Sequence, residues 1–267
     1  MNLKTSIISI SLGCFGSSFV INSSQAAILN GDFNNGLQNW QTIGDVSIQT
    51  DFSSGNLSNP QALLTTASSL LQDDGIPAGA FNLSGNDPAS AQFPGFNLQS
   101  FLGLGSTNLN SGFLPATEGS AIKQVFAAKE NDVLSFEFNF LTNDASFFGS
   151  PRDFATIALQ DNSSGVISTI SLAQSTGNLS NSSTIFQQET GWRTYRSGQL
   201  KAGNYTLGFG VIDVFGTDKT SALLIDNVLL SSETTTPIPE PTSLMLGALM
   251  ALGVGSRLKK KAKSNRG

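Results

Sequence analysis

Leu-Ser-Phe-Glu-Phe-Asn-Phe, at positions 134–140, alternates large apolar residues with polar ones. Successive side chains of a β-strand point to opposite faces, so this stretch predicts a strand with one buried and one solvated face. Positions 205–211 repeat the pattern, with four large apolar residues separated by threonine and glycine, namely Tyr205, Leu207, Phe209 and Val211. The two stretches predict a protein built from sheets with apolar inner faces.

Shorter stretches of the same kind surround these two. Strands are predicted at 155–159, 166–172, 192–200 and 223–230, between turns rich in Gly, Asn, Asp and Ser. No long helical period occurs, and one short helix is predicted at 67–71. We therefore expect an all-β fold, a single antiparallel jelly-roll-like β-sandwich over residues 28–232. Its segment 51–117 is rich in Gly, Ser, Asn and Pro. We expect it to form strands joined by long loops over one end of the sandwich, either as a binding region or as a decoration without a ligand.

Both ends of this body resemble a known group of folds. The segments 28–33 (Ile-Leu-Asn-Gly-Asp-Phe) and 37–40 (Leu-Gln-Asn-Trp) resemble the opening strand of carbohydrate-binding-module and galactose-binding-like jelly rolls, and 224–228 (Leu-Ile-Asp-Asn-Val) resembles their closing strand. The resemblance implies that the first and last strands lie side by side, often with a structural calcium between them.

Asp226 is the centre of this possible calcium site. In the strand pattern it shares a face with Leu224 and Val228, and a carboxylate on an apolar face is costly unless it is paired or bound to a metal. Asp32, Asn34 and nearby backbone carbonyls would supply further oxygen ligands, which suit calcium. The alternative is that Asp226 accepts hydrogen bonds from backbone amides and that the protein has no cofactor.

Four aromatic residues are candidates for stacking on a sugar ring. Trp40 and Tyr205 fall in the apolar patterns of predicted strands, so we expect both in the core. Trp192 and Tyr195 begin a strand after Gly191 and are the candidate glycan contacts.

Residue composition excludes several classes of enzyme. The chain has no histidine and one cysteine, so Ser-His-Asp and Cys-His mechanisms are impossible. A glycosidase that uses two carboxylates remains an alternative, with Glu137, Asp144, Asp153 and Asp213 as candidates, although nothing in the sequence marks two of them as a pair. We expect a protein that is not an enzyme.

Charge argues against nucleic-acid binding. Residues 28–238 contain 18 acidic and 7 basic residues, a net charge of −11. Such a body repels polyanions.

The first 27 residues have the pattern of a secretory signal peptide. Lys4 precedes the apolar stretch 7–21, and small residues follow at Ser24 and Ala26, so cleavage is expected after Ala26 or Ala27. Cys14 lies in the removed part, and the mature protein would have no disulfide. A lipoprotein is the alternative, through Ser-Leu-Gly-Cys at 11–14, although a serine stands where a bulky aliphatic residue is usual.

The last 29 residues combine three features in order. Pro239-Glu240-Pro241 is an extended triplet, because its prolines fix φ and remove backbone donors. Residues 242–256 are uncharged and would span about 22 Å as a helix, less than the roughly 30 Å of a bilayer core. A basic cluster follows and predicts a cytoplasmic end, with Arg257, Lys259, Lys260, Lys261 and Lys263 as its first members.

This tail resembles the PEP-CTERM sorting signal of exported bacterial proteins, which a membrane-embedded exosortase is thought to recognise and cleave. The resemblance implies a linker at 233–238, a sorting signal at 239–267 with a short transmembrane helix, and a transient stay in the inner membrane. We expect an exported cell-surface or extracellular-matrix protein whose β-sandwich has a non-catalytic structural or adhesive role. The alternative function is a glycan-binding module, with a matrix polysaccharide as its partner.

Overall fold

The computed structural model describes residues 27–50, 52, 59–92, 97–105, 109–111, 114–144 and 153–232. The chain divides into two units, 1–232 and 233–267, and every described residue belongs to the first. The predicted signal peptide up to Ala26, the linker and the sorting signal lie outside the described residues. In the described ranges, no helix is long and apolar enough to cross a membrane.

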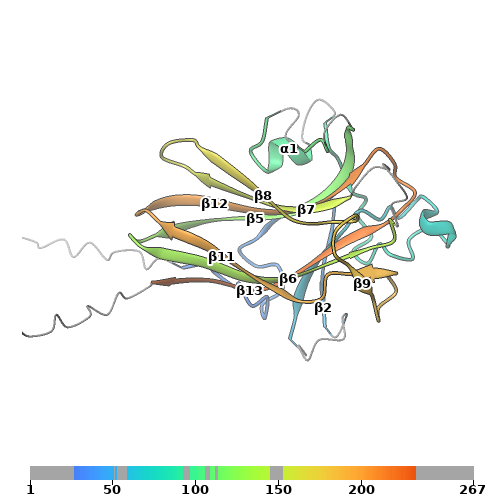
Figure 1. Ribbon diagram of the computed structural model, residues 1–267, viewed down its shortest axis with the longest axis horizontal. Helices are drawn as coiled ribbons and strands as arrows, with labels where there is room; N and C mark the ends of the chain where they lie inside the picture. Colours follow the sequence, from blue (N-terminus) through green and yellow to red (C-terminus); the bar gives the residue numbers. More distant parts are fainter. Residues whose placement is uncertain are drawn as a thin grey trace, which may run out of the picture. The chain divides into compact units, whose positions relative to one another are not determined.

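Two antiparallel sheets form the body, which confirms the predicted all-β sandwich (Figure 1). The first sheet has the order β1-β5-β12-β7-β8, and β4 also pairs with β5. Its strands are β1 (Gln41–Ile43), β4 (Ala89–Ser90), β5 (Ala116–Ala128), β7 (Phe154–Asp161), β8 (Ile167–Gln174) and β12 (Gly203–Val214).

The second sheet has the order β2-β3-β13-β6-β10-β9, and β11 also pairs with β6. Its strands are β2 (Asp45–Gln49), β3 (Gln61–Thr65), β6 (Asp132–Thr142), β9 (Ser180–Asn181), β10 (Gln188–Glu189), β11 (Arg193–Leu200) and β13 (Ser221–Ser232). The chain passes from one sheet to the other between β5 and β6, β6 and β7, β11 and β12, and β12 and β13. This repeated crossing gives the jelly-roll arrangement.

The main core lies between the sheets and contains the residues that the alternating patterns predict. From β6 it takes Leu134, Phe136, Phe138 and Phe140, and from β12 it takes Tyr205, Leu207, Phe209 and Val211. Phe136 and Phe209 meet edge to face across the sandwich, with ring centroids 4.8 Å apart. The period-two pattern therefore predicts correctly which faces are buried.

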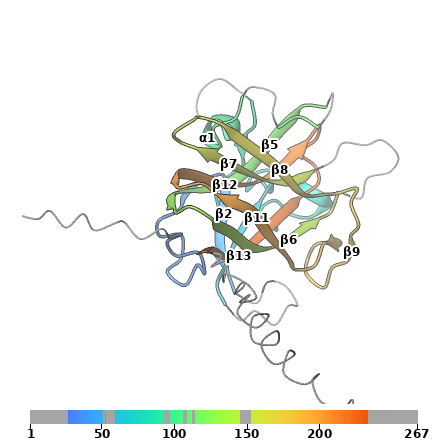
Figure 2. The ribbon, with the colours of Figure 1, turned by 60° about the vertical axis from the view of Figure 1, so that its left-hand side comes forward.

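The long segment before β5 covers the outer face of the first sheet. Helix α1 (Leu98–Phe101) packs its apolar side chains on Ile212 and Ala158 in a second apolar cluster. Both views place α1 outside the layer that holds β5 and β7 (Figure 1, Figure 2).

The helix predicted at 67–71 is wrong. These residues form bends, because side chains bind the backbone N–H groups that a helix would use. The Ser68 hydroxyl accepts from the N–H groups of Leu70 and Leu71, and Asp73 and Asp87 accept from those of Ser68 and Ser69. The helical element nearby is the 3₁₀ turn η1 (Asp73–Gly75).

The opening segment is a series of turns instead of a strand. Asn30, Phe33, Gly36 and Asn39 all have positive φ, which is incompatible with an extended strand. The segment nevertheless reaches the closing strand, because the Val228 N–H donates to the Gly31 carbonyl at 2.9 Å. A Cβ at Gly31 would lie 2.0 Å from the Val228 carbonyl oxygen, so this close approach requires glycine.

A β-bulge changes the face that was predicted for Val228. The pairing of β13 with β6 shifts after Asp226, and Asn227 has φ 52°. The extra residue turns Val228 into the main core and leaves Leu229 55% exposed. Asp226 and Val228 therefore lie on opposite faces.

Candidate functional site

One end of the sandwich brings together three loops that are far apart in the sequence. They are the segment from Ser68 to Pro88, the residues at the end of β6 and the start of β7, and the β12–β13 connection. Backbone hydrogen bonds join them: Asn143 N donates to Thr220 O, and Asp74 N donates to Asp218 O, both at 2.9 Å. We call this end the acidic rim because it carries Asp73, Asp74, Asp87, Glu118, Asp144, Asp153, Asp213 and Asp218.

Asp153 and Asp213 form a buried carboxyl pair at the centre of the acidic rim. They stand at the start of β7 and near the end of β12, and are 2% and 3% exposed. Asp153 accepts hydrogen bonds from Val214 N at 3.2 Å and from Ser221 Oγ at 2.6 Å. The two carboxyl groups are also close enough for each to shift the pKa of the other. No donor in the described part of the chain reaches Asp213 Oδ2.

Burial and mutual repulsion make this pair hold its protons tightly. Burial raises the pKa of Asp153 to about 7, against the lowering effect of the Ser221 hydroxyl. Burial and then the charge of Asp153 raise the pKa of Asp213 to about 11, and Glu118 and Asp144 add to this. The pair titrates as a unit and keeps at least one proton across the neutral range.

The pair lines a pocket of about 340 Å³, together with Asp144, Val214, Phe215, Gly216, Asp218 and Lys219. Phe215 stands at its edge with 62% of its surface exposed and a backbone φ of 71°. A bulky residue rarely adopts this left-handed conformation. Its N–H donates to the Pro115 carbonyl at 3.0 Å, which ties the loop to β5.

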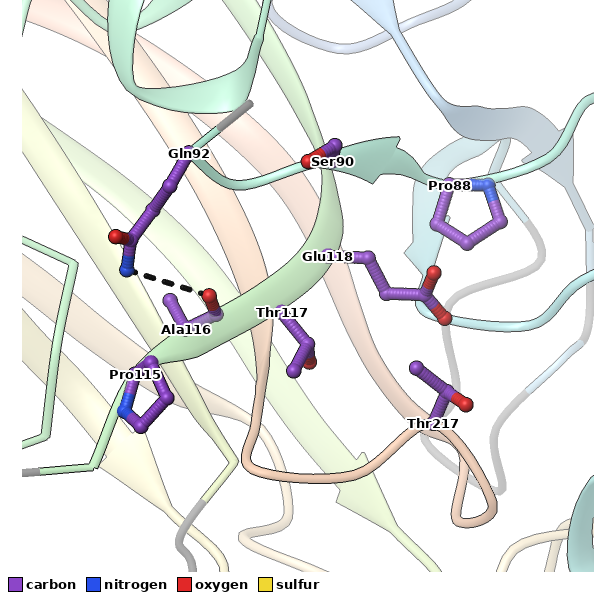
Figure 3. A pocket seen from close by; sticks show the side chains of 8 residues that line it. All are labelled: Pro88, Ser90, Gln92, Pro115, Ala116, Thr117, Glu118 and Thr217. Carbon is purple, nitrogen blue, oxygen red and sulfur yellow. Dashed lines mark hydrogen bonds between the residues drawn. The ribbon is translucent and has the colours of Figure 1, made fainter. Parts of the chain in front are cut away.

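A second pocket of about 490 Å³ adjoins the same loop (Figure 3). Glu118 extends from β5 between Pro88 and Thr217, and its Oε1 meets no donor among the described residues. Burial, then the charges of Asp73 and Asp87, raise the pKa of Glu118 to about 7. Thr117 lines this second pocket and contacts the wall of the first. Its hydroxyl donates hydrogen bonds to the backbone carbonyls of Asp213, at 3.0 Å, and Gly216, at 2.8 Å.

The residues predicted for calcium lie at the junction of the opening segment and β13. Asp226 is fully buried, its Oδ1 accepts from Asn227 N at 2.7 Å, and its Oδ2 has no donor within the described ranges. Burial, then the charges of Glu137 and Asp32, raise its pKa to about 6. Asp32 accepts from the amide nitrogen of the Asn34 side chain at 2.6 Å.

This arrangement fits a calcium ion in one respect, since an unpaired buried carboxylate oxygen is a suitable hard ligand. In the described residues, however, no group of three or more His, Cys, Asp or Glu side chains is placed to hold a metal. The sequence pattern did not identify Glu137 as a neighbour of Asp226. The Glu137 carboxylate accepts a hydrogen bond from the side-chain amide of Asn227 at 2.8 Å. The cross-strand pairing of Asp226 with Glu137 is what brings them together.

The predicted glycan contacts lie elsewhere in the second sheet. Tyr195 is half-buried and stacks on Phe136 with centroids 4.8 Å apart, at the margin of the main core. Trp192 is half-buried against a third apolar cluster that contains Phe81 and Phe186. Trp40 and Tyr205 are buried, as predicted.

Three of the four glycosidase candidates converge at the acidic rim. Asp144 joins Asp153 and Asp213 in lining one pocket, and its Oδ2 accepts from Ser175 Oγ at 2.7 Å. Glu137 lies in β6 beside Asp226 instead. Phe215 was missed from the sequence, and its one local signal is a large apolar residue before Gly216 in a turn.

No protein-family model and no curated protein matches the chain. Among solved structures, a family 61 carbohydrate-binding module in complex with β-1,4-galactotriose has a TM-score of 0.41 and 11% identity, over 79% of this chain and all of that one. A Caldicellulosiruptor saccharolyticus family 27 module in complex with mannohexaose has a TM-score of 0.39 and 10% identity, over 77% and 97%. The enzymatically active domain of tailspike protein 4 of bacteriophage CBA120 has a TM-score of 0.38 and 10% identity, over 77% and 21%. Similarity this low carries no ligand or activity over to this chain.

Proposed function

We propose that the β-sandwich is a non-catalytic carbohydrate-binding module with an adhesive role outside the cell, and that it binds its glycan at the acidic rim beside Phe215. The observation that carries this proposal is the exposed, left-handed Phe215 at the edge of a pocket lined by carboxyl groups.

Two features of Phe215 each cost the folded state free energy. A phenyl ring that is 62% exposed forgoes burial, and a positive φ costs a bulky residue about 1–3 kcal/mol. Such costs cluster at ligand sites, where the surrounding structure holds the residue in place. A flat, exposed ring offers the apolar face that the C–H groups of a sugar pack on.

The remaining lining of the pocket suits hydroxyl groups. Asp144 and Asp218 offer carboxylate oxygens, which accept strong hydrogen bonds from O–H donors. A small number of converging polar groups beside an apolar wall is the usual composition of a small-ligand site.

The burial of the carboxyl pair argues against hydrolysis. Glycosidases separate their two carboxyl groups by about 5–5.5 Å or about 6.5–9.5 Å, to leave room for the sugar or for water. Asp153 and Asp213 are only 2% and 3% exposed, so little of either carboxyl group is open to a sugar that would lie between them.

A glycan array with the full chain tests the binding proposal. We expect binding to one class of polysaccharide and loss of that binding in Phe215→Ala. The control variant Val125→Ala changes an apolar residue on β5 that is 60% exposed, and it should keep the binding. Equal binding by both variants, or silence across the array, contradicts the proposal. Silence would favour a structural role without a ligand.

Delivery is the second part of the proposal. The signal peptide exports the chain, the uncharged segment 242–256 holds it briefly in the inner membrane, and an exosortase-type enzyme cleaves near Pro239-Glu240-Pro241. Replacing Glu240 with Ala should leave uncut precursor in the membrane fraction. Normal release of that variant would contradict this route.

A further inference from the structure

The pocket beside Phe215 concentrates negative charge around one unpaired oxygen. Four acidic residues line it: Asp144, Asp153, Asp213 and Asp218. Within the described ranges, Lys219 is the cation in its lining, and its Nζ lies 3.7 Å from Asp74 Oδ1. The ammonium group of Lys219 is therefore already engaged by a carboxylate of another loop.

Asp213 Oδ2 is the second, independent observation. Asp213 is 97% buried, it lines the pocket, and this oxygen has no hydrogen-bond donor in the described ranges. A buried acceptor without a donor costs about 1–3 kcal/mol. A ligand that brings N–H donors and a positive charge would satisfy it.

We infer that this pocket binds a protonated amino group, and that the glycan it recognises is an amino-sugar polymer with free amines. This inference rests on the proposed carbohydrate site. An ammonium group has three N–H donors for carboxylate oxygens, and it is also attracted to the face of an aromatic ring. Asp213, Asp144 and Phe215 supply both kinds of partner within one pocket.

The same charges select against other sugars. A uronic acid or sulfated sugar would bring a further negative charge to a pocket with four acidic groups, which is repulsive in a partly buried site. An N-acetylated sugar would bring a bulkier neutral amide with a single N–H. We therefore expect the site to bind the free amine more tightly than its acetylated form.

Cation binding should also release a proton from the carboxyl pair. Among the described residues, the charged groups that face the carboxyl pair are Asp144, Asp218, Glu118 and Lys219, and burial keeps the pair protonated. An ammonium group that replaces the proton supplies the same single positive charge to the pair. Binding heats should therefore differ between buffers with different heats of ionisation.

Calorimetric titration of the full chain tests the inference, at about 0.15 M salt to screen the general attraction of an acidic protein for polycations. The ligands are a fully deacetylated glucosamine hexamer and its fully acetylated counterpart, both with EDTA present. We expect at least tenfold tighter binding of the deacetylated form, with proton release.

Two pocket variants and one control make the result specific. Asp213→Asn and Asp218→Asn should each weaken binding of the deacetylated hexamer about tenfold. Asp218 is exposed, so its replacement leaves the core intact. Asp161→Asn removes an equal charge at the other end of β7 and should leave binding unchanged. Equal binding of the two hexamers or an equal loss in Asp161→Asn overturns the inference. If neutral glycans bind through Phe215 without preference for the amine, only this inference fails; if neither hexamer nor any arrayed glycan binds, the proposed function fails as well.

Discussion

At the scale of single residues, the Asp153–Asp213 pair gives the protein an unusual dependence of stability on pH. Both pKa values lie above the ordinary value for aspartate, so the folded protein keeps protons that the unfolded chain releases near about pH 4. The folded state is therefore favoured at acidic pH, and it loses stability as pH rises through the folded pKa values.

Replacing Asp213 with Asn should flatten this dependence above about pH 7. The amide cannot titrate, and it can donate to Asp153 in place of the protonated carboxyl group. Between about pH 7 and 9 we expect the wild type to lose up to about 1.4 kcal/mol of unfolding free energy per pH unit, and the variant to lose little. Urea denaturation at several pH values measures this. Asp161→Asn is the control and should follow the wild type, and parallel curves for all three proteins would disprove the account.

Phe215 should show a conflict between stability and binding. Asn adopts positive φ more readily than phenylalanine, so Phe215→Asn relieves backbone strain at φ 71°. We expect an unfolding free energy higher by about 0.5–1 kcal/mol, together with the loss of glycan binding. Leu229→Asn, at a residue that is 55% exposed and has ordinary φ, should bring no such gain. A loss of stability in Phe215→Asn would mean that the ring packs against its loop and is not a free platform.

At the scale of elements, the strands were predictable and the turns were not. The alternation at 134–140 indicates its own buried face, because each strand has only two faces and one is apolar. The prediction for the opening segment, residues 28–40, was wrong because its apolar residues suggested a strand. Phe33 instead enters the core from a turn with φ 52°. Conformations of this kind depend on contacts such as Gly31 with Val228, which lie nearly 200 residues apart in the sequence.

The junction of this segment with β13 is where the calcium proposal can be tested. If calcium binds Asp226 and Asp32, adding EDTA should lower the melting temperature. A ligand at about 100 times its Kd contributes about 2.7 kcal/mol, which corresponds to roughly 5–10 °C for a domain of this size. Asp226→Asn should melt at one temperature with or without EDTA. An unchanged melting temperature in the wild type removes calcium from this site.

At the scale of the whole molecule, the acidic rim exists only because the chain changes sheets repeatedly. Asp144, Asp153 and Asp213 stand out from the sequence as carboxylates, but their spacing of 9 and 60 residues does not pair them. The crossings from β6 to β7 and from β12 to β13 bring them to one pocket. Sequence patterns report local period and burial, whereas this site depends on which strands become neighbours.

The same scale sets where the exported body should begin. Leu29 is tied to β5 by two hydrogen bonds, from its N–H to Gln124 Oε1 at 2.7 Å and from Gln124 Nε2 to its carbonyl at 2.9 Å. Ile28 packs against the main core, so the fold starts immediately after the expected cleavage site at Ala26 or Ala27. A peptidase needs an extended, accessible chain, and we therefore expect cleavage before this segment docks. N-terminal sequencing of the secreted protein should begin at Ala27 or Ile28, and the protein should show no free thiol because Cys14 has been removed. A lipid-modified N-terminus at Cys14 would instead establish the lipoprotein alternative, with 14 additional residues between the lipid and the folded body.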